Sequence, residues 1–157
     1  MKMLKHIPNI LTLLNLLCGT IAVIFAVNNE LEIAAYFVFL GIFFDFFDGF
    51  AARLLNVSGE LGKQLDSLAD VVTSGVVPGI VLFQLLTSEK SHLSIKNLEV
   101  SWGNSDFEIW PYFGLLFTLA AAYRLAKFNI DERQTSSFIG LPTPAATLVV
   151  LSLPLIL

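Results

Sequence analysis

The stretch that decides the fold spans residues 45–70 and reads DFFDGFAARLLNVSGELGKQLDSLAD. It carries four aspartates, although it joins two long runs that are mostly apolar. One pair of aspartates lies near the end of the first run, and the other pair lies near the start of the second. A run of roughly 20 mostly apolar residues is long enough for a helix to cross a bilayer. The aspartates therefore lie inside predicted membrane spans, where ionisable groups indicate a functional site.

Five apolar runs along the chain predict an all-α fold, a polytopic bundle of transmembrane helices. They cover residues 7–29, 31–55, 61–86, 108–128 and 141–157. Pro78, which lies between Gly75 and Gly79, is expected to kink the third span. Residues 1–157 are expected to form a single integral-membrane domain. Because the last run stops without a polar flank, we expect the chain to be truncated at its C-terminus, with at least one further helix in the full-length protein.

The composition favours a membrane protein and excludes several other classes. Hydrophobic residues make up 55% of the chain and charged residues only 14%, against about 25% charged residues in soluble domains. The mean hydropathy is +0.76. A single cysteine, Cys18, excludes an intrachain disulfide framework and a CxxC metal site. The formal charge of −4 leaves no basic surface for nucleic acid.

The distribution of lysine and arginine predicts the orientation in the membrane. Seven basic residues fall on the side of the N-terminus and of the loops after the second and fourth spans, and two fall on the other side. The seven are Lys2, Lys5, Arg53, Lys63, Arg124, Lys127 and Arg133, and the two are Lys90 and Lys96. We therefore expect a multi-pass protein of the cell (inner) membrane, with its N-terminus and the aspartates on the cytoplasmic side.

The spacing of the aspartates predicts one shared cavity. Asp45 and Asp48 are three residues apart and Asp66 and Asp70 four, so each pair shares one helix face. The short connection makes the two helices antiparallel neighbours, which brings the pairs to similar depth. An aspartate at a bilayer centre costs roughly 2.5–3.5 kcal/mol, and Arg53 balances one charge at most. Such carboxylates suit a hard divalent cation, and four of them can hold a two-metal centre for phosphoryl displacement.

Two other interpretations of the aspartates remain open. In the first, the aspartates are caps or interfacial groups at helix ends. In the second, they belong to a cation or proton transporter, because acidic residues inside a membrane also mark such proteins. A transporter predicts polar residues across the whole membrane, and the first span beyond Thr20 shows no such path. Gly49, Ala52 and Gly62 favour a bulky ligand beside the acids, because small side chains let it approach the backbone. They also permit close helix packing.

The pattern D-x2-D-G-x2-A-R-x8-G-x3-D-x3-D, from Asp45 to Asp70, resembles the signature of the CDP-alcohol phosphatidyltransferases. Further segments resemble the bacterial and archaeal phosphatidylserine synthases of that superfamily. These segments cover residues 8–19, 64–75, 124–129 and 138–145. The resemblance implies a bundle of six or more helices in the full-length protein and a homodimer.

The resemblance also implies the reaction. A phosphatidyl group moves from CDP-diacylglycerol to the hydroxyl of L-serine, giving phosphatidylserine and CMP. The implied cofactor is Mg²⁺ or Mn²⁺ in a two-metal site held by Asp45, Asp48, Asp66 and Asp70, and Asp70 also matches the position of the general base. The implied partners are these substrates and membrane lipid, with no nucleic acid. The alternative is a sibling that uses glycerol phosphate or inositol phosphate, although a phosphorylated acceptor needs a denser basic pocket.

Further residues are expected at the two substrates. Those expected at CDP-diacylglycerol are Asn9, Thr12, Asn15, Gly49, Ala52, Arg53 and Gly62. Arg124 and Lys127 are expected at the serine carboxylate, since arginine suits bidentate binding of a carboxylate. The alternatives are structural: polar residues of the first span also hold helices together, and basic residues near span ends also anchor topology.

Overall fold

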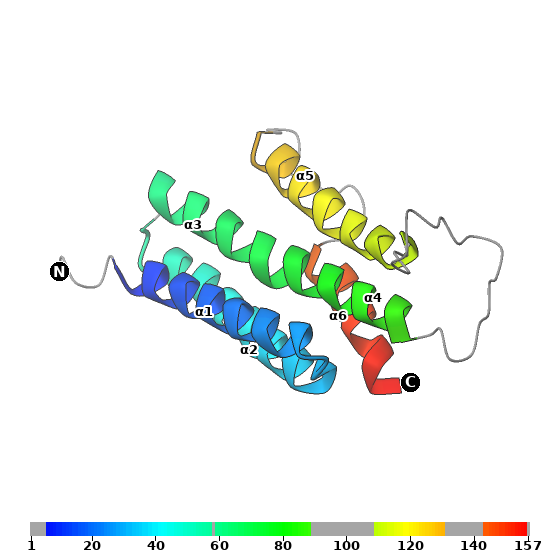
Figure 1. Cartoon of the computed structure of the whole chain (residues 1–157). Coiled ribbons are helices and arrows are strands. Elements are labelled where there is room, and N and C mark those ends of the chain that lie inside the picture. The colour runs from blue at the N-terminus through cyan, green and yellow to red at the C-terminus, as the bar shows by residue number, and fades with distance from the viewer. Residues whose placement is uncertain (1–5, 58, 89–108, 131–142, 157) are drawn as a thin grey trace.

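The computed structural model describes residues 6–57, 59–88, 109–130 and 143–156, and all regular structure in these ranges is helical (Figure 1). The α-helices are α1 (Ile7–Val27), α2 (Leu31–Leu54), α3 (Glu60–Val71), α4 (Val77–Ser88), α5 (Leu116–Ile130) and α6 (Thr143–Ile156). A π-helical segment, η2 (Val72–Val76), joins α3 to α4, and a 3-10 segment, η4 (Trp110–Leu115), precedes α5. The prediction of an all-α bundle is confirmed.

Among the described residues, three helices are long and apolar enough to cross a membrane: α1, α2 and the continuous run Glu60–Thr87. They coincide with the first three predicted spans. The fourth predicted span is η4 followed by the 15 residues of α5, and α6 covers 14 residues of the fifth. Several parts of the sequence interpretation lie outside the described residues. They are Lys2, Lys5, Lys90, Lys96, Arg133 and the segment 138–142.

The first two helices form an antiparallel hairpin (Figure 1). Each ends at an asparagine with positive φ, 64° at Asn29 and 52° at Asn56, a conformation that asparagine tolerates better than most residues. In both turns the next residue, Glu30 or Val57, donates its backbone N–H to the carbonyl five residues earlier. These bonds satisfy carbonyls of the last helical turn. The second turn ends α2 soon after its aspartates and returns the chain as α3.

The helices α3 and α4 form one rod with η2 at its centre, and this rod packs along α1 (Figure 1). The irregular segment precedes Pro78, which has no N–H to offer the carbonyl of Ser74. Thr147 of α6 donates to that carbonyl at 2.9 Å, and Thr118 of α5 donates to the Gly75 carbonyl at 2.9 Å. The kink expected at Pro78 therefore takes the form of a π-helical segment. Threonines of two other helices satisfy its carbonyls, as a membrane interior requires.

The core consists mainly of small side chains, and the large apolar side chains lie outside it. Small residues let helices in a membrane approach closely. The phenylalanines of α2 illustrate the outer surface, since the side chain of Phe46 is 70% exposed and that of Phe50 is 56% exposed. The described core residues are Ala22, Ala26, Ala34, Ala35, Val38, Val77, Val81, Val150 and Leu151. This arrangement is typical of a helix bundle surrounded by lipid.

Candidate metal centre and active site

Three of the four aspartates converge between α2 and α3. Asp45 and Asp48 lie on α2 and Asp66 lies on α3, and one carboxylate oxygen from each lies within 4.8 Å of the other two. Asp48 is buried, with 6% of its surface exposed, and the other two are half-buried. The antiparallel return of the chain after α2 produces this arrangement, because it sets the two acidic faces against each other. The predicted convergence of these three side chains is confirmed, whereas their roles remain a prediction.

Asp70 lies outside this group of three, one helical turn further along α3. It is half-buried. The fourth aspartate is thus adjacent to the group without completing it. Its position separates it from the three residues that best fit one cation.

Polar side chains of α1 contact the aspartates of α2. Thr12 Oγ1 donates to Asp48 Oδ2 at 2.5 Å, and Asn15 Nδ2 donates to Asp45 Oδ1 at 3.5 Å. Both α1 residues are buried, with 4% of the surface of Thr12 exposed and 1% of that of Asn15. They share one face of α1, since they are three residues apart. The polar side of the first span therefore supports the carboxylates directly.

Thr73 is a buried polar residue of this region that was not expected from the sequence. It lies in η2, and its Oγ1 donates to Asn15 Oδ1 at 2.9 Å. The signal was its spacing, because Asp66, Asp70 and Thr73 are separated by four and then three residues and so share one helix face. A neutral threonine within an apolar span has no charge that would single it out from the sequence.

The donor set fits a hard divalent cation. Three carboxylates within 4.8 Å of one another place negative charges side by side in a partly buried site. Within the described ranges, no lysine or arginine forms an ion pair with any of the four aspartates. Mg²⁺ and Mn²⁺ prefer carboxylate oxygens. A divalent cation would therefore offset a charge that the described side chains leave uncompensated.

The small residues of the signature leave one side of the cluster open. Gly49 is exposed, and a Cβ built on it would meet no atom within 4 Å. Ala52 is half-buried and Arg53 is exposed. Gly62 of α3 is tighter, because a Cβ there would lie 3.1 Å from Asn9 Oδ1 of α1. Space for a bulky ligand is therefore greatest on the α2 side.

The two basic residues expected at serine lie on α5 in different surroundings. Arg124 is half-buried, and its Nη1 donates to Thr143 Oγ1 at the start of α6 at 3.1 Å, whereas Lys127 is exposed. The end of α5 is attached to α3, because Asn129 Nδ2 donates to Ser67 Oγ at 2.5 Å. Ser67 follows Asp66 directly, so this bond connects the helix that carries Arg124 to the helix that carries Asp66.

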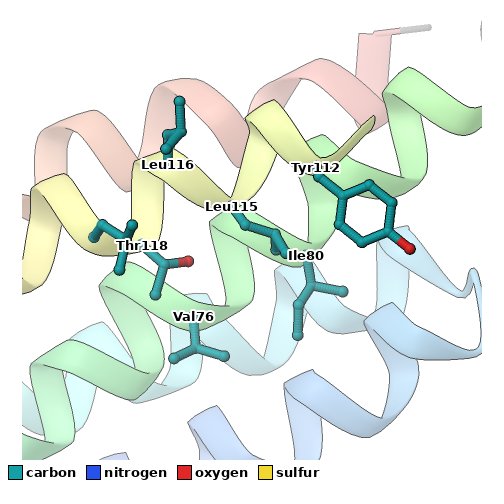
Figure 2. A pocket seen from close by; sticks show the side chains of 7 residues that line it. Val76, Ile80, Tyr112, Leu115, Leu116 and Thr118 are labelled. Carbon is teal, nitrogen blue, oxygen red and sulfur yellow. The ribbon is translucent and has the colours of Figure 1, made fainter. Parts of the chain in front are cut away.

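A separate cavity of about 480 Å³ lies between α4 and the η4–α5 segment (Figure 2). Leucines and branched side chains dominate its lining, including Val76, Ile80 and Leu115, and no charged residue is among the seven that line it. Thr118 and Tyr112 contribute its polar atoms (Figure 2). The cavity therefore lies apart from the carboxylates.

Comparison with known proteins relates the whole chain to one family. The family model described as CDP-alcohol phosphatidyltransferase matches residues 5–157. The CDP-diacylglycerol--serine O-phosphatidyltransferase of Bacillus subtilis is 34% identical over 155 residues, which cover 95% of this chain and 76% of the relative. No solved structure matches the chain.

More distant relatives carry similar names. The CDP-diacylglycerol--serine O-phosphatidyltransferase of Helicobacter pylori strain J99 is 31% identical, and the match covers 91% of this chain and 54% of the relative. The archaetidylserine synthase of Methanothermobacter thermautotrophicus is 28% identical, with coverage of 93% and 56%. The chain thus spans about half the length of these two relatives.

Proposed function

The chain belongs to the CDP-alcohol phosphatidyltransferase family, and we propose that it transfers a phosphatidyl group from CDP-diacylglycerol to the hydroxyl of L-serine. The products are phosphatidylserine and CMP. The names of the relatives from Bacillus and Helicobacter support serine as the acceptor. The membrane-compatible helices support a lipid substrate that stays in the bilayer.

The observation that carries the proposal is the convergence of Asp45, Asp48 and Asp66, with ligand oxygens within 4.8 Å of one another. The diphosphate of CDP-diacylglycerol is anionic, and it would not approach three bare carboxylates. We propose that these three aspartates hold Mg²⁺ or Mn²⁺ and that Asp70 is either a fourth ligand or the general base. A bound divalent cation at such a site neutralises diphosphate oxygens and stabilises the departing phosphate.

The chemistry requires one proton transfer by the protein. The serine hydroxyl oxygen forms a bond to the phosphorus that carries diacylglycerol, and the bond from that phosphorus to the CMP oxygen breaks. CMP leaves with the electron pair, and the hydroxyl proton passes to Asp70. Asp70 suits this role because it lies beside the group of three without belonging to it. A general base must be within hydrogen-bond reach of the proton it accepts.

The remaining expected residues receive proposed roles from their surroundings. The open side at Gly49, with Ala52 and Arg53, would admit the nucleotide, and Gly62 and Asn9 would border it. Thr12 and Asn15 would hold the carboxylates through the bonds described above. Arg124 and Lys127 would bind the serine carboxylate.

Two further parts of the proposal concern the orientation in the membrane and the oligomeric state. The bias in Lys and Arg supports an active site on the cytoplasmic side of the cell membrane. The family resemblance supports a homodimer and a single domain that comprises the whole chain.

The test is an acceptor panel with the full chain in lipid nanodiscs. CDP-diacylglycerol and Mn²⁺ are supplied with serine, glycerol phosphate or inositol phosphate, and released CMP is measured. We expect CMP release with serine and little with the other two. Release with an alcohol phosphate alone would assign the chain to a sibling activity, and release with none would contradict the proposed function.

A further inference from the structure

The carboxylates are supported by a second layer of hydrogen bonds that ends at Thr73. Thr73 and Asn15 are both 1% exposed, and the Thr73 hydroxyl donates to Asn15 Oδ1 at 2.9 Å. On its other side the Asn15 amide donates to Asp45 Oδ1 at 3.5 Å. A chain of bonds therefore leads from η2 through α1 to the carboxylates.

The Asp45 carboxylate accepts from the Asn15 amide, and the Thr73 hydroxyl holds the other end of the amide in place. An asparagine side chain presents an acceptor oxygen at one end and an NH₂ donor at the other. The carboxylate of Asp45 only accepts, so it requires Nδ2 on its side, and the Thr73 hydroxyl donates to the Oδ1 that then faces η2. The opposite orientation would place Oδ1 against a carboxylate oxygen, and two acceptors cannot bond. In this buried position no solvent would compensate for that mismatch.

The packing leaves little room for any other arrangement. A Cβ on Gly41 would lie 2.9 Å from Asn15 Oδ1 and 3.0 Å from Thr73 Cγ2. Gly19 of α1 is equally close to Thr73, because a Cβ there would overlap the hydroxyl oxygen. Glycines on α1 and α2 thus create the space in which Thr73 and Asn15 meet. The pair is confined by the backbone of two helices.

We propose that Thr73 is a positioning residue for the metal centre, which acts by fixing the Asn15 amide so that its NH₂ group orients Asp45. This inference rests on the proposed function, because it assumes that the aspartates bind a divalent cation. Residues that orient metal ligands typically affect metal affinity by about 10- to 100-fold. Thr73 acts through one intermediate residue, so we expect the lower end of this range.

The test measures Mn²⁺ binding to the full chain in nanodiscs by electron paramagnetic resonance, without substrate. Thr73→Val removes the hydroxyl and keeps the volume, and we expect about tenfold weaker binding. Thr73→Ser restores a hydroxyl and should recover affinity to within about twofold of the unmodified chain. Thr73→Ala also removes the hydroxyl donor, but it places no additional methyl group against Asn15. It therefore replaces the valine variant if that variant does not fold.

The matched control is Thr118→Val. Thr118 also donates to η2, at the Gly75 carbonyl, but no bond leads from it to an aspartate. The control should lower the melting temperature while leaving Mn²⁺ affinity unchanged. An equal loss of affinity in Thr73→Val and Thr118→Val would show a general structural effect and overturn the inference.

A double variant tests the route through the amide. In an Asn15→Leu background, Thr73→Val should cause no further loss of Mn²⁺ affinity, and an additional tenfold loss would refute a role through Asn15.

The outcomes of these Mn²⁺-binding experiments also separate the positioning role of Thr73 from the proposed function. Undiminished binding in Thr73→Val refutes the positioning role alone, whereas absence of Mn²⁺ binding by the unmodified chain refutes the proposed function, and the inference with it.

Discussion

Thr12→Val tests whether α1 holds a metal ligand in place. In the structure Thr12 Oγ1 donates to Asp48 Oδ2 at 2.5 Å, and both residues are almost fully buried, at 4% and 6% exposure. Valine has nearly the same shape as threonine, so the substitution removes the hydroxyl without opening a cavity. Asp48 would lose the one side-chain donor that the structure gives it among the described residues.

The size of the effect follows from the kind of bond. A hydrogen bond to a charged group contributes about 1.5–3 kcal/mol, and each 1.4 kcal/mol corresponds to about tenfold in a binding constant. If the whole contribution were expressed in metal binding, Mn²⁺ affinity would fall by about 10- to 100-fold. We therefore expect CMP release to fall by at least about tenfold at limiting Mn²⁺ and to recover largely at saturating Mn²⁺.

The assay is a Mn²⁺ titration of CMP release by the full chain, with Thr20→Val as the control. The single proton of the Thr12 hydroxyl is shared with the Pro8 carbonyl four residues back, at 3.0 Å, and Thr20 donates to the equivalent carbonyl of Leu16 at 2.8 Å. Thr20 is exposed, and no hydrogen bond links it to an aspartate. The difference between the two variants thus isolates the contact with Asp48. An unchanged Mn²⁺ dependence in Thr12→Val would refute the reasoning.

Further predictions concern the base and the packing of the site. Asp70→Asn should reduce turnover by at least about a hundredfold, since a general base contributes about 10²–10⁴-fold to the rate. The same variant should weaken Mn²⁺ binding less than Asp48→Asn does. If it weakened Mn²⁺ binding more, Asp70 would be chiefly a metal ligand. Gly41→Ala should lower unfolding free energy by about 1–3 kcal/mol, because its Cβ would lie 2.9 Å from Asn15 Oδ1. Gly49→Ala, which meets no atom within 4 Å, should leave thermal stability undiminished in a melting assay while slowing CMP release; equal destabilisation by both alanines would contradict the packing described here.

The sequence predicted the helices and the convergence of acids because both depend on local periodicity. Apolar runs of bilayer length indicate spans whatever surrounds them. The spacing of Asp45, Asp48 and Asp66 sets their helix faces, and the short connection leaves antiparallel packing as the simple solution. The helix bounds shifted by only a few residues, since Asn29 and Asn56 end α1 and α2 in left-handed turns.

The irregular segments could not be predicted from local sequence. Pro78 indicated a disturbance in the third span, but the π-helical form of η2 depends on partners from elsewhere in the chain. Thr118 and Thr147 belong to helices more than 40 residues further along the sequence, and they bond carbonyls of this segment. A proline alone does not show which donors will replace its missing N–H.

The second layer of the site escaped prediction for a related reason. Asn15 and Thr73 are 58 residues apart, and neutral polar side chains in membrane spans have many possible partners. Asp70 is a similar case, because helix periodicity places it on the face of Asp66 but does not determine how far it lies from the group of three. Only the relative placement of α1, α2 and α3 distinguishes these roles.

The most direct measurement of the central claim is an anomalous difference map from crystals of the full chain grown with Mn²⁺ and CDP-diacylglycerol. We expect a manganese peak coordinated by oxygens of Asp45, Asp48 and Asp66. A bound lipid diphosphate with no manganese at these carboxylates, or with manganese held by other residues, would contradict that claim.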